Sequence, residues 1–335
     1  MKRTKLMILA VLFVFTVNAM AQERGAGQRG QTNAGAPGAP GAQRGGGGGR
    51  GNPAPPLTPE EEKIKAAAQE RLKLPMDTLD TVWIEEMTDP EVRAAISGGK
   101  TTGIILTGGV ESNGPHLASG KHNYVLSQTG EAIARRLGNA LVAPVVTLEP
   151  GQVGRPVGGG WVSLSQETYR AVLIDMGDSM RGMGFKNILY LGDSGSNTGG
   201  MQTAANALND KYKGEPARFY HIPEYYDYRS VQQYIQQELK IPEQIRLGAS
   251  NGWSDGIHEE YAIAALMALK DPTTIRFYQR VKAGRAIING VELAPLWKTI
   301  ENGRKFLEVR TKLTVAGIQK AMALPPPRYG NTQQQ

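Results

Sequence analysis

Short apolar runs alternate along this chain with segments of helical periodicity, and that order limits the folds open to it. The runs that could each form one buried strand are Thr101 to Val110, Ala140 to Leu148, Asn187 to Leu191 and Arg218 to Ile222. Repeated strand–helix–strand order predicts a largely parallel sheet with helices on both faces. The expected architecture is therefore an α/β fold in the form of a three-layer α/β/α sandwich.

Three segments carry signals for helix ends. Thr58-Pro59-Glu60-Glu61 supplies an N-cap, a proline at the first helical position and an acidic third residue. Ser163-Leu-Ser-Gln166 has the spacing of a capping box, and the helix after it is expected to end at Gly184. Glu259 to Leu269 is predicted to form a further helix, with Glu260 in its first turn.

The first 21 residues have the order of a secretory signal. Lys2, Arg3 and Lys5 precede the apolar run Leu6 to Val17, and Ala19-Met20-Ala21 follows it. This run is shorter than the roughly 20 residues that span a bilayer. We therefore expect residues 1–21 to be a signal peptide cleaved after Ala21, leaving no membrane span. The mature protein is expected in the periplasm or outside the cell.

Residues 22–57 are dominated by Gly, Ala, Pro, Gln and Arg. Such a segment cannot bury enough apolar surface to offset chain entropy, so we interpret it as a disordered linker. The folded domain is predicted over residues 58–325, with a flexible tail at 326–335. Of the net charge of +7, the leader carries three units and the linker a further net three. The domain itself keeps about +1, which argues against a nucleic-acid partner.

The chain has no cysteine. This excludes a disulfide framework, a thiolate zinc site and a cysteine nucleophile. Any bound metal must therefore use histidine and carboxylate ligands.

A polar cluster follows the first apolar run directly. It is Glu111-Ser-Asn-Gly-Pro-His116-Leu-Ala-Ser-Gly-Lys-His122, and it holds two of the four histidines. Glu111 would lie at the carboxyl end of a strand, where open α/β sheets bind their ligands. A third histidine lies in a second acidic cluster, Asp255-Gly-Ile-His258-Glu259-Glu260. The concentration of such side chains predicts a functional site.

These motifs resemble the creatininase (creatinine amidohydrolase) family between about Trp83 and Glu292. The matching segments are Glu111 to Ala118 with His122, then Gly158 to Thr168, then Gly192-Asp193-Ser-Gly-Ser-Asn197, and then Asp255 to Ala262. The resemblance implies a creatininase-like fold. It also implies a metal-dependent hydrolase and a homo-oligomer.

The family's ligand positions carry altered residues here. Counted from Glu111, the plus-two position is Asn113 and the plus-eleven position is His122; the histidine of the central turn is replaced by Asp193, followed by Gly195. Glu111, His122 and Asp193 keep the family's inventory of two carboxylates and one imidazole. The resemblance thus implies that they hold one divalent ion, Zn²⁺ or Mn²⁺. A second ion is not expected, because Asn113 is a weak ligand, Gly195 has no side chain and an imidazole cannot bridge two ions.

In the resemblance, Asp255 stands where the family has a histidine and Glu260 where it has a glutamate, and His258, three residues after Asp255, is the candidate replacement for that histidine. Glu260 would be the general base, His258 or His116 would protonate a leaving nitrogen, and Asp255 would orient His258. The expected reaction is metal-dependent hydrolysis of a non-peptide carbon–nitrogen bond, in a cyclic or linear amide. The expected substrate is therefore a small-molecule amide.

Two alternatives remain open from the sequence. Taken singly, Glu111 and Asp193 could cap helices, His116 could be a core histidine and His122 a surface residue. Taken together, the altered ligand positions are also compatible with a catalytically inactive, exported binding protein that retains the fold. Metal content would separate this protein from the enzyme.

Overall fold

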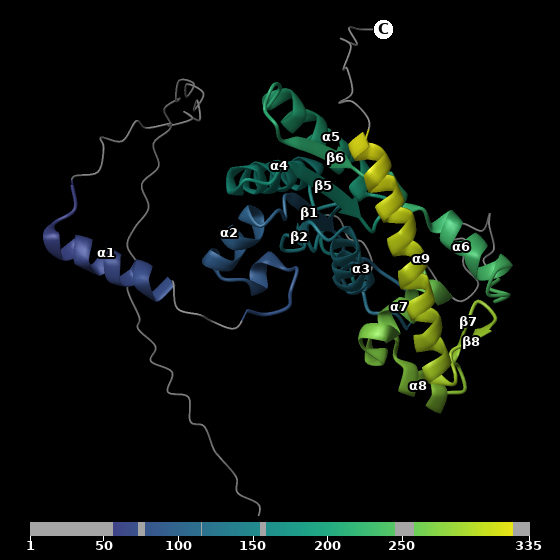
Figure 1. Cartoon of the computed structure of the whole chain (residues 1–335). Helices are drawn as coiled ribbons and strands as arrows, with labels where there is room; N and C mark the ends of the chain where they lie inside the picture. The colour runs from purple at the N-terminus through teal and green to yellow at the C-terminus, as the bar shows by residue number, and fades with distance from the viewer. Residues whose placement is uncertain (1–55, 73–77, 115, 155–158, 245–257, 324–335) are drawn as a thin grey trace, which may run out of the picture. The chain divides into compact units, whose positions relative to one another are not determined.

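The structure is a computed structural model that describes residues 56–72, 78–114, 116–154, 159–244 and 258–323 (Figure 1). The chain divides into two compact units, Met1–Lys63 and Ile64–Gln335. The predicted signal peptide, almost all of the linker, the tail and Asp255 lie outside the described residues.

Helices make up most of the regular structure. The α-helices are α1 (Pro59–Leu72), α2 (Asp89–Ser97), α3 (Lys121–Leu137), α4 (Gln166–Met183), α5 (Asn197–Lys211), α6 (Tyr228–Gln237), α7 (Tyr261–Lys270), α8 (Phe277–Lys282) and α9 (Leu296–Ala323). The short 3-10 helices are η1 (Ile84–Glu86), η2 (Pro223–Tyr226) and η3 (Pro272–Ile275). In the described part of the chain, no helix combines the length and the apolar character needed to cross a bilayer.

The central sheet is parallel throughout. Its four strands are β2 (Ala140–Val142), β1 (Thr102–Thr107), β5 (Asn187–Gly192) and β6 (Arg218–His221), in that spatial order. Two small ribbons lie outside it, β3 (Glu149–Pro150) with β4 (Ser163–Leu164), and β7 (Ile287–Ile288) with β8 (Val291–Glu292). The predicted parallel sheet is confirmed, and its strands begin within a residue of the predicted positions.

Helices cover both faces of this sheet, as Figure 1 shows for α4 and α5 and for α3 and α9. Side chains of a strand point alternately to its two faces. On β1, Ile105 packs in one core with α4 and α5, whereas its neighbours Ile104 and Leu106 pack in another with α3 and α9. The three-layer α/β/α arrangement expected from the sequence is therefore present.

Local details differ from the expectations in two places. Ser163 lies in β4, and the residue that caps α4 is Ser165, whose hydroxyl accepts from the backbone N–H of Thr168 at 3.1 Å. The two serines have similar capping chemistry, and the pairing of β3 with β4 decides between them. Glu260 is the N-cap of α7 rather than a residue of its first turn.

Candidate active site

The predicted site residues gather at the carboxyl edge of the sheet. Glu111 follows β1 after a short loop, and Asp193 follows β5 directly. β1 and β5 are neighbouring parallel strands, paired up to Thr107 and Gly192. Parallel neighbours end at the same edge of a sheet, which is where α/β folds bind ligands.

His122 connects the two carboxylates. Its Nδ1 lies 2.8 Å from Asp193 Oδ2 and its Nε2 lies 3.0 Å from Glu111 Oε1. Burial alone would lower the pKa of His122, but the hydrogen bonds to Asp193 and Glu111 raise it above the usual value. Without an ion the imidazole can therefore keep both protons. The Nε2 proton and a metal ion are alternative occupants of the gap between His122 and Glu111.

Asp193 is fully buried and held from three sides. Its Oδ1 accepts from Arg310 Nη2 and, at 3.0 Å, from the hydroxyl of Tyr228, while Oδ2 faces His122. Burial would raise the pKa of Asp193, but the Arg310 guanidinium and the bond to His122 lower it. Asp193 therefore stays ionised, with both oxygens bound to other side chains.

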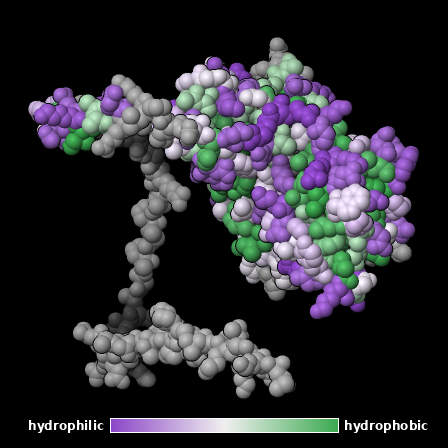
Figure 2. Space-filling view, turned by 60° about the horizontal axis from the view of Figure 1, so that its bottom comes forward, coloured by the Kyte–Doolittle hydropathy of each residue, from purple (hydrophilic) through white to green (hydrophobic). Residues whose placement is uncertain are grey.

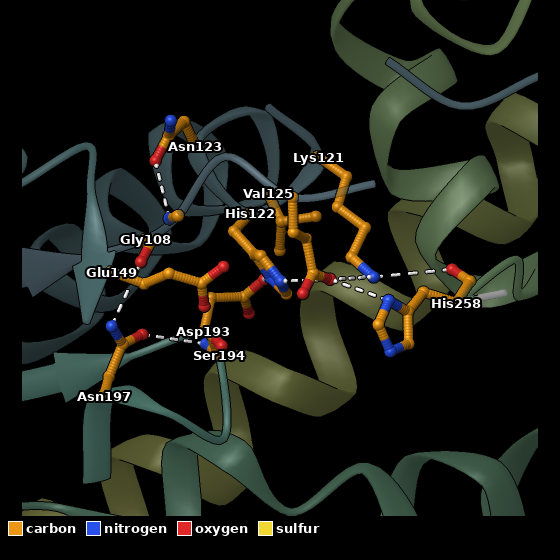
Figure 3. A network of polar contacts seen from close by, with 12 residues as sticks. Gly108, Lys121, His122, Asn123, Val125, Glu149, Asp193, Ser194, Asn197 and His258 are labelled. Carbon is orange, nitrogen blue, oxygen red and sulfur yellow. Dashed lines mark hydrogen bonds and ion pairs between the residues drawn. The ribbon is translucent and has the colours of Figure 1, made fainter. Parts of the chain in front are cut away.

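Three side-chain nitrogen atoms surround one carboxylate oxygen of Glu111. Its Oε1 lies 2.8 Å from Lys121 Nζ, 3.0 Å from His122 Nε2 and 3.2 Å from His258 Nδ1. Burial opposes ionisation of Glu111, yet these contacts hold its pKa far below the usual range. Figure 3 shows Lys121, His122 and His258 converging on this point from α3 and from the segment before α7.

Glu149, in β3, is the third carboxylate of the site. One ligand atom each from Glu111, His122 and Glu149 lie within 4.8 Å of one another, and all three residues are buried. The hydroxyl of Ser196 donates to Glu149 Oε2 at 2.6 Å. Oε1 is buried, and the described residues provide no hydrogen-bond partner for it.

The donor set of Glu111, His122 and Glu149 fits one divalent ion. With ligand bonds of about 2.0 to 2.2 Å, adjacent ligand atoms are roughly 3 to 3.5 Å apart. The 3.0 Å between His122 Nε2 and Glu111 Oε1 is close to that spacing. Two carboxylates and one imidazole suit Zn²⁺ or Mn²⁺.

Asp193, the third ligand expected from the sequence, lies behind His122 and orients its ring, as a carboxylate often does for a metal-binding histidine. Within the described residues, the group able to hold an ion contains Glu149 in its place.

Glu260 is 8% exposed and lines a cavity that Glu111, His122 and Glu149 also line. Burial, reinforced by the nearby Glu243 carboxyl, raises the pKa of Glu260 to about 8. Glu260 is therefore mostly protonated at neutral pH. A protonated carboxyl group can donate a proton, which differs from the general-base role inferred from the sequence.

The three remaining predicted residues have different surroundings. His258 lines the cavity and has a positive φ of 59°, a conformation that histidine adopts more readily than most residues. His116 donates its backbone N–H to Glu259 Oε1 at 2.9 Å and is not among the residues that line the cavity. Asp255 lies outside the described residues.

A buried network fixes the start of α7, beside His258 and Glu260. Arg280 Nη2 lies 3.0 Å from Glu259 Oε1, and Asn289 Nδ2 donates to the carbonyl of Glu259 at 2.8 Å and to Glu243 Oε1 at 2.9 Å. Glu243 Oε1 also accepts from the backbone N–H of Tyr261 at 2.6 Å. These contacts fasten the segment before α7 to α8 and the β7–β8 turn.

The cavity has a volume of about 490 Å³, within the range of small-molecule sites. Its charged and imidazole groups are Glu111, Lys121, His122, Glu149, His258 and Glu260, and its aromatic walls are Trp161, Tyr226 and Tyr228. Such a site can accommodate a small planar polar molecule.

Four residues of this site were not identified from the sequence. Glu149 directly follows the run predicted as a strand at 140–148, so the edge argument applied to Glu111 would have found it. Lys121 is adjacent to His122. Arg310 and Tyr228 have no local signal, because they reach Asp193 only through the packing of α9 and α6.

Comparison with known proteins identifies the family of this chain. A family model, creatininase, described as creatinine amidohydrolase, matches residues 85–304. The chain therefore belongs to the creatininase family, as its motifs indicated. Arg310 lies beyond the matched residues.

Solved structures share the fold. A tryptophan-to-alanine variant of a creatininase has a TM-score of 0.53 and 17% identity, over 73% of this chain and 100% of that chain. A tryptophan-to-phenylalanine variant of a creatininase, termed type II, has a TM-score of 0.52 and 16% identity over the same shares. No curated protein sequence matches the chain.

Proposed function

We propose that this chain is a metal-dependent amidohydrolase that cleaves a non-peptide carbon–nitrogen bond in a small cyclic or linear amide. The observation that carries the proposal is the buried group of Glu111, His122 and Glu149, with ligand atoms within 4.8 Å of one another at the wall of the cavity. The buried Glu149 Oε1 supports it: the described residues provide no hydrogen-bond partner for this oxygen, and a buried carboxylate oxygen without one is costly unless a cation binds it. Membership of the creatininase family supplies the reaction class.

A divalent ion, when bound, would lower the pKa of a water molecule and polarise the substrate carbonyl. The residues of the chain provide the remaining functions. Asp193 holds the His122 ring through Nδ1, so that Nε2 faces the candidate ion position. Ser196 fixes one oxygen of Glu149, and the other oxygen is buried and has no hydrogen-bond partner among the described residues.

We assign the proton donor to Glu260. Its raised pKa of about 8 keeps the carboxyl protonated at neutral pH, and it faces the cavity. A leaving amide nitrogen needs a proton as the carbon–nitrogen bond breaks, and the Glu260 carboxyl can supply it. The Trp161 and Tyr226 side chains provide the walls against which a planar amide can stack.

The test combines metal analysis with a substrate screen. Purified protein equilibrated with Zn²⁺ or Mn²⁺ should retain one ion per chain. In a panel of small amides, a cyclic substrate should give a ring-opened product heavier by one water, and a linear substrate should give an acid and an amine whose masses sum to that of the substrate plus one water. Glu149→Gln, which keeps the shape but removes the charge, should lose the ion and the activity together. Glu308→Gln, on the exposed part of α9, is the matched control and should change neither.

A second candidate is a catalytically inactive binding protein. It is favoured by the contacts of His122, whose two nitrogens are both engaged by carboxylates, and by Lys121, which already neutralises Glu111. Absence of metal and of hydrolysis, together with thermal stabilisation by a small amide, would support this candidate and overturn the enzyme.

Export and self-association complete the proposal. Cleavage after Ala21 would make Gln22 the first residue of the mature protein, which N-terminal sequencing of the exported form tests.

The visible surface in Figure 2 mixes hydrophilic and hydrophobic residues. Among the residues that the structure describes, twelve large hydrophobic side chains are exposed, and four of them lie between residues 278 and 297: Tyr278, Val281, Ile287 and Trp297. We propose that copies of the chain pair through this segment, and light scattering of Trp297→Gln against the wild type tests it.

A further inference from the structure

Lys121 is an unusual residue for its position. It is the first residue of α3, a helix of 17 residues, and its side chain is 4% exposed. A positive charge at the N-terminus of a helix is unfavourable, because the helix dipole is positive there. The first turn of α3 contains no acidic residue, and Gly120 provides no side-chain cap. Neither the helix nor the solvent therefore explains a buried ammonium group here.

The contacts of Lys121 instead point into the candidate site. Its Nζ lies 2.8 Å from Glu111 Oε1 and donates to the backbone carbonyl of His258 at 3.4 Å. Figure 3 shows the Lys121 side chain extending toward His258, beside His122. The ammonium group thus occupies a position next to a candidate ligand oxygen.

The formal charges around His122 nearly balance without a metal. Glu111, Glu149 and Asp193 provide three carboxylates. Arg310 pairs with Asp193 and Lys121 with Glu111, in contacts whose side chains are almost fully buried. A doubly protonated His122 offsets the third carboxylate, but an ion bound at Nε2 replaces that proton and leaves the imidazole neutral. One negative charge then remains, on Glu149, which also has the buried oxygen without a partner among the described residues. A single remaining negative charge suits one divalent ion better than two.

An ion bound at Glu111 Oε1 would share that oxygen with the ammonium group. Like charges at such a distance repel strongly when little water separates them. A second ion could bind on this side of Glu111 only if Lys121 moved away. The chain therefore contains its own monovalent cation at this point.

We propose that Lys121 is a tethered cation of the candidate metal site, which holds Glu111 in place and limits the site to a single divalent ion. This inference rests on the proposed function, because it concerns the same site. It makes Lys121 a positioning residue that sets how many ions bind and how tightly.

The experiment compares metal occupancy in the wild type, Lys121→Gln and Lys121→Met. Each full-length protein is equilibrated with Zn²⁺ or Mn²⁺ and desalted, and bound metal is measured by mass spectrometry. Affinity is measured by competition with a chelating dye. Circular dichroism checks folding, and the methionine variant keeps the apolar stem in case the glutamine variant does not fold. Lys211→Gln, which removes an ion pair with Asp178 on the surface, is the matched control.

We expect one ion per chain in the wild type and in Lys211→Gln. The Lys121 variants should bind a second ion, or bind the single ion about tenfold or more tightly. A wild type without metal and variants with one ion would still support the tethered cation, while overturning metal dependence of the native protein.

Two outcomes would overturn the inference. One ion of equal affinity in all proteins would remove the role of Lys121 and leave the proposed metal site intact. No ion in any protein would overturn both.

Discussion

His122 Nδ1 lies 2.8 Å from Asp193 Oδ2, on the side of the imidazole away from Glu111. The two residues occupy positions where the family motifs carry an aspartate and a histidine in the opposite order. The exchange therefore does not simply move a ligand from one loop to the other. In this chain the imidazole faces Glu111, and the carboxylate holds the imidazole from behind.

Replacing Asp193 with asparagine should damage both stability and metal binding. The change leaves the buried Arg310 without its counterion, and breaking a buried ion pair typically costs about 3 to 5 kcal/mol. Loss of the carboxylate behind His122 should weaken metal affinity by roughly 10- to 100-fold. Urea unfolding and metal titration measure the two effects.

The control for this change is Glu308→Gln. Glu308 lies on α9, as Arg310 does, and the change removes its exposed ion pair with Arg136 of α3. Exposed pairs contribute about 0 to 1 kcal/mol. Equal destabilisation in the two variants would contradict the buried role of Asp193.

Replacing Gly109 with alanine should remove Glu149 from the site. A Cβ at Gly109 would lie 2.6 Å from the carboxyl carbon of Glu149, closer than side-chain contacts allow. The Glu149 carboxylate would have to shift, so bound metal should fall while the fold persists. Gly199→Ala is the control, since a Cβ there meets no atom within 4 Å. Normal metal content in Gly109→Ala would show that Glu149 is not a ligand.

Glu260 should make the stability of the metal-free protein depend on pH in a defined direction. Its pKa is raised from the model-compound value of 4.5 to about 8, so the folded state keeps a proton that the unfolded state releases. Stability contributed by this group is present below pH 4.5 and is lost as the pH rises toward 8. The free energy of unfolding of Glu260→Gln should therefore exceed that of the wild type, by a margin that grows as the pH rises from 4.5 to 8. The margin should reach the order of a few kcal/mol.

Denaturant unfolding of both proteins from pH 5 to pH 9 measures this margin, and groups common to both proteins cancel in the difference. The same variant should lower turnover by roughly 10²- to 10⁴-fold if Glu260 donates the proton. Activity of the wild type should then decline above about pH 8. Activity that instead rises through pH 8 would restore the general-base role.

Deleting residues 22–57 should leave the melting temperature and any activity unchanged. The segment has too few apolar residues to pack on the domain. Differential scanning fluorimetry of the deletion and the full mature chain measures the effect. A fall of several degrees would show that the segment docks on the folded part.

The sequence was sufficient for the layers of the fold and for half of the site. Apolar runs such as Thr101 to Val110 predict buried parallel strands because both faces of such a strand are covered. Glu111, His122 and Asp193 could be grouped because each lies in or beside a recognisable motif. Ser163 was mistaken for a cap because capping chemistry alone does not distinguish it from Ser165, which begins a helix after a short β-bridge.

The missing half of the site depends on contacts between distant segments. Arg310 and Asp193 are 117 residues apart, and no local pattern in α9 marks that arginine as buried. The raised pKa of Glu260 likewise follows from its burial and from Glu243, which belongs to another segment. Such effects appear only once the elements are packed.

The ion pair between Arg310 and Asp193 also orders the steps by which a growing chain can mature. Asp193 is synthesised well before Arg310, so a nascent chain that ends ahead of α9 carries this carboxylate without its counterion. The edge of the sheet that forms the cavity cannot then reach its final electrostatic balance, and its burial remains costly. Folding of this region is accordingly expected to wait for α9. Ribosome-bound chains that end before Leu296 should be digested by protease at this edge, and the full-length chain released from the ribosome should resist.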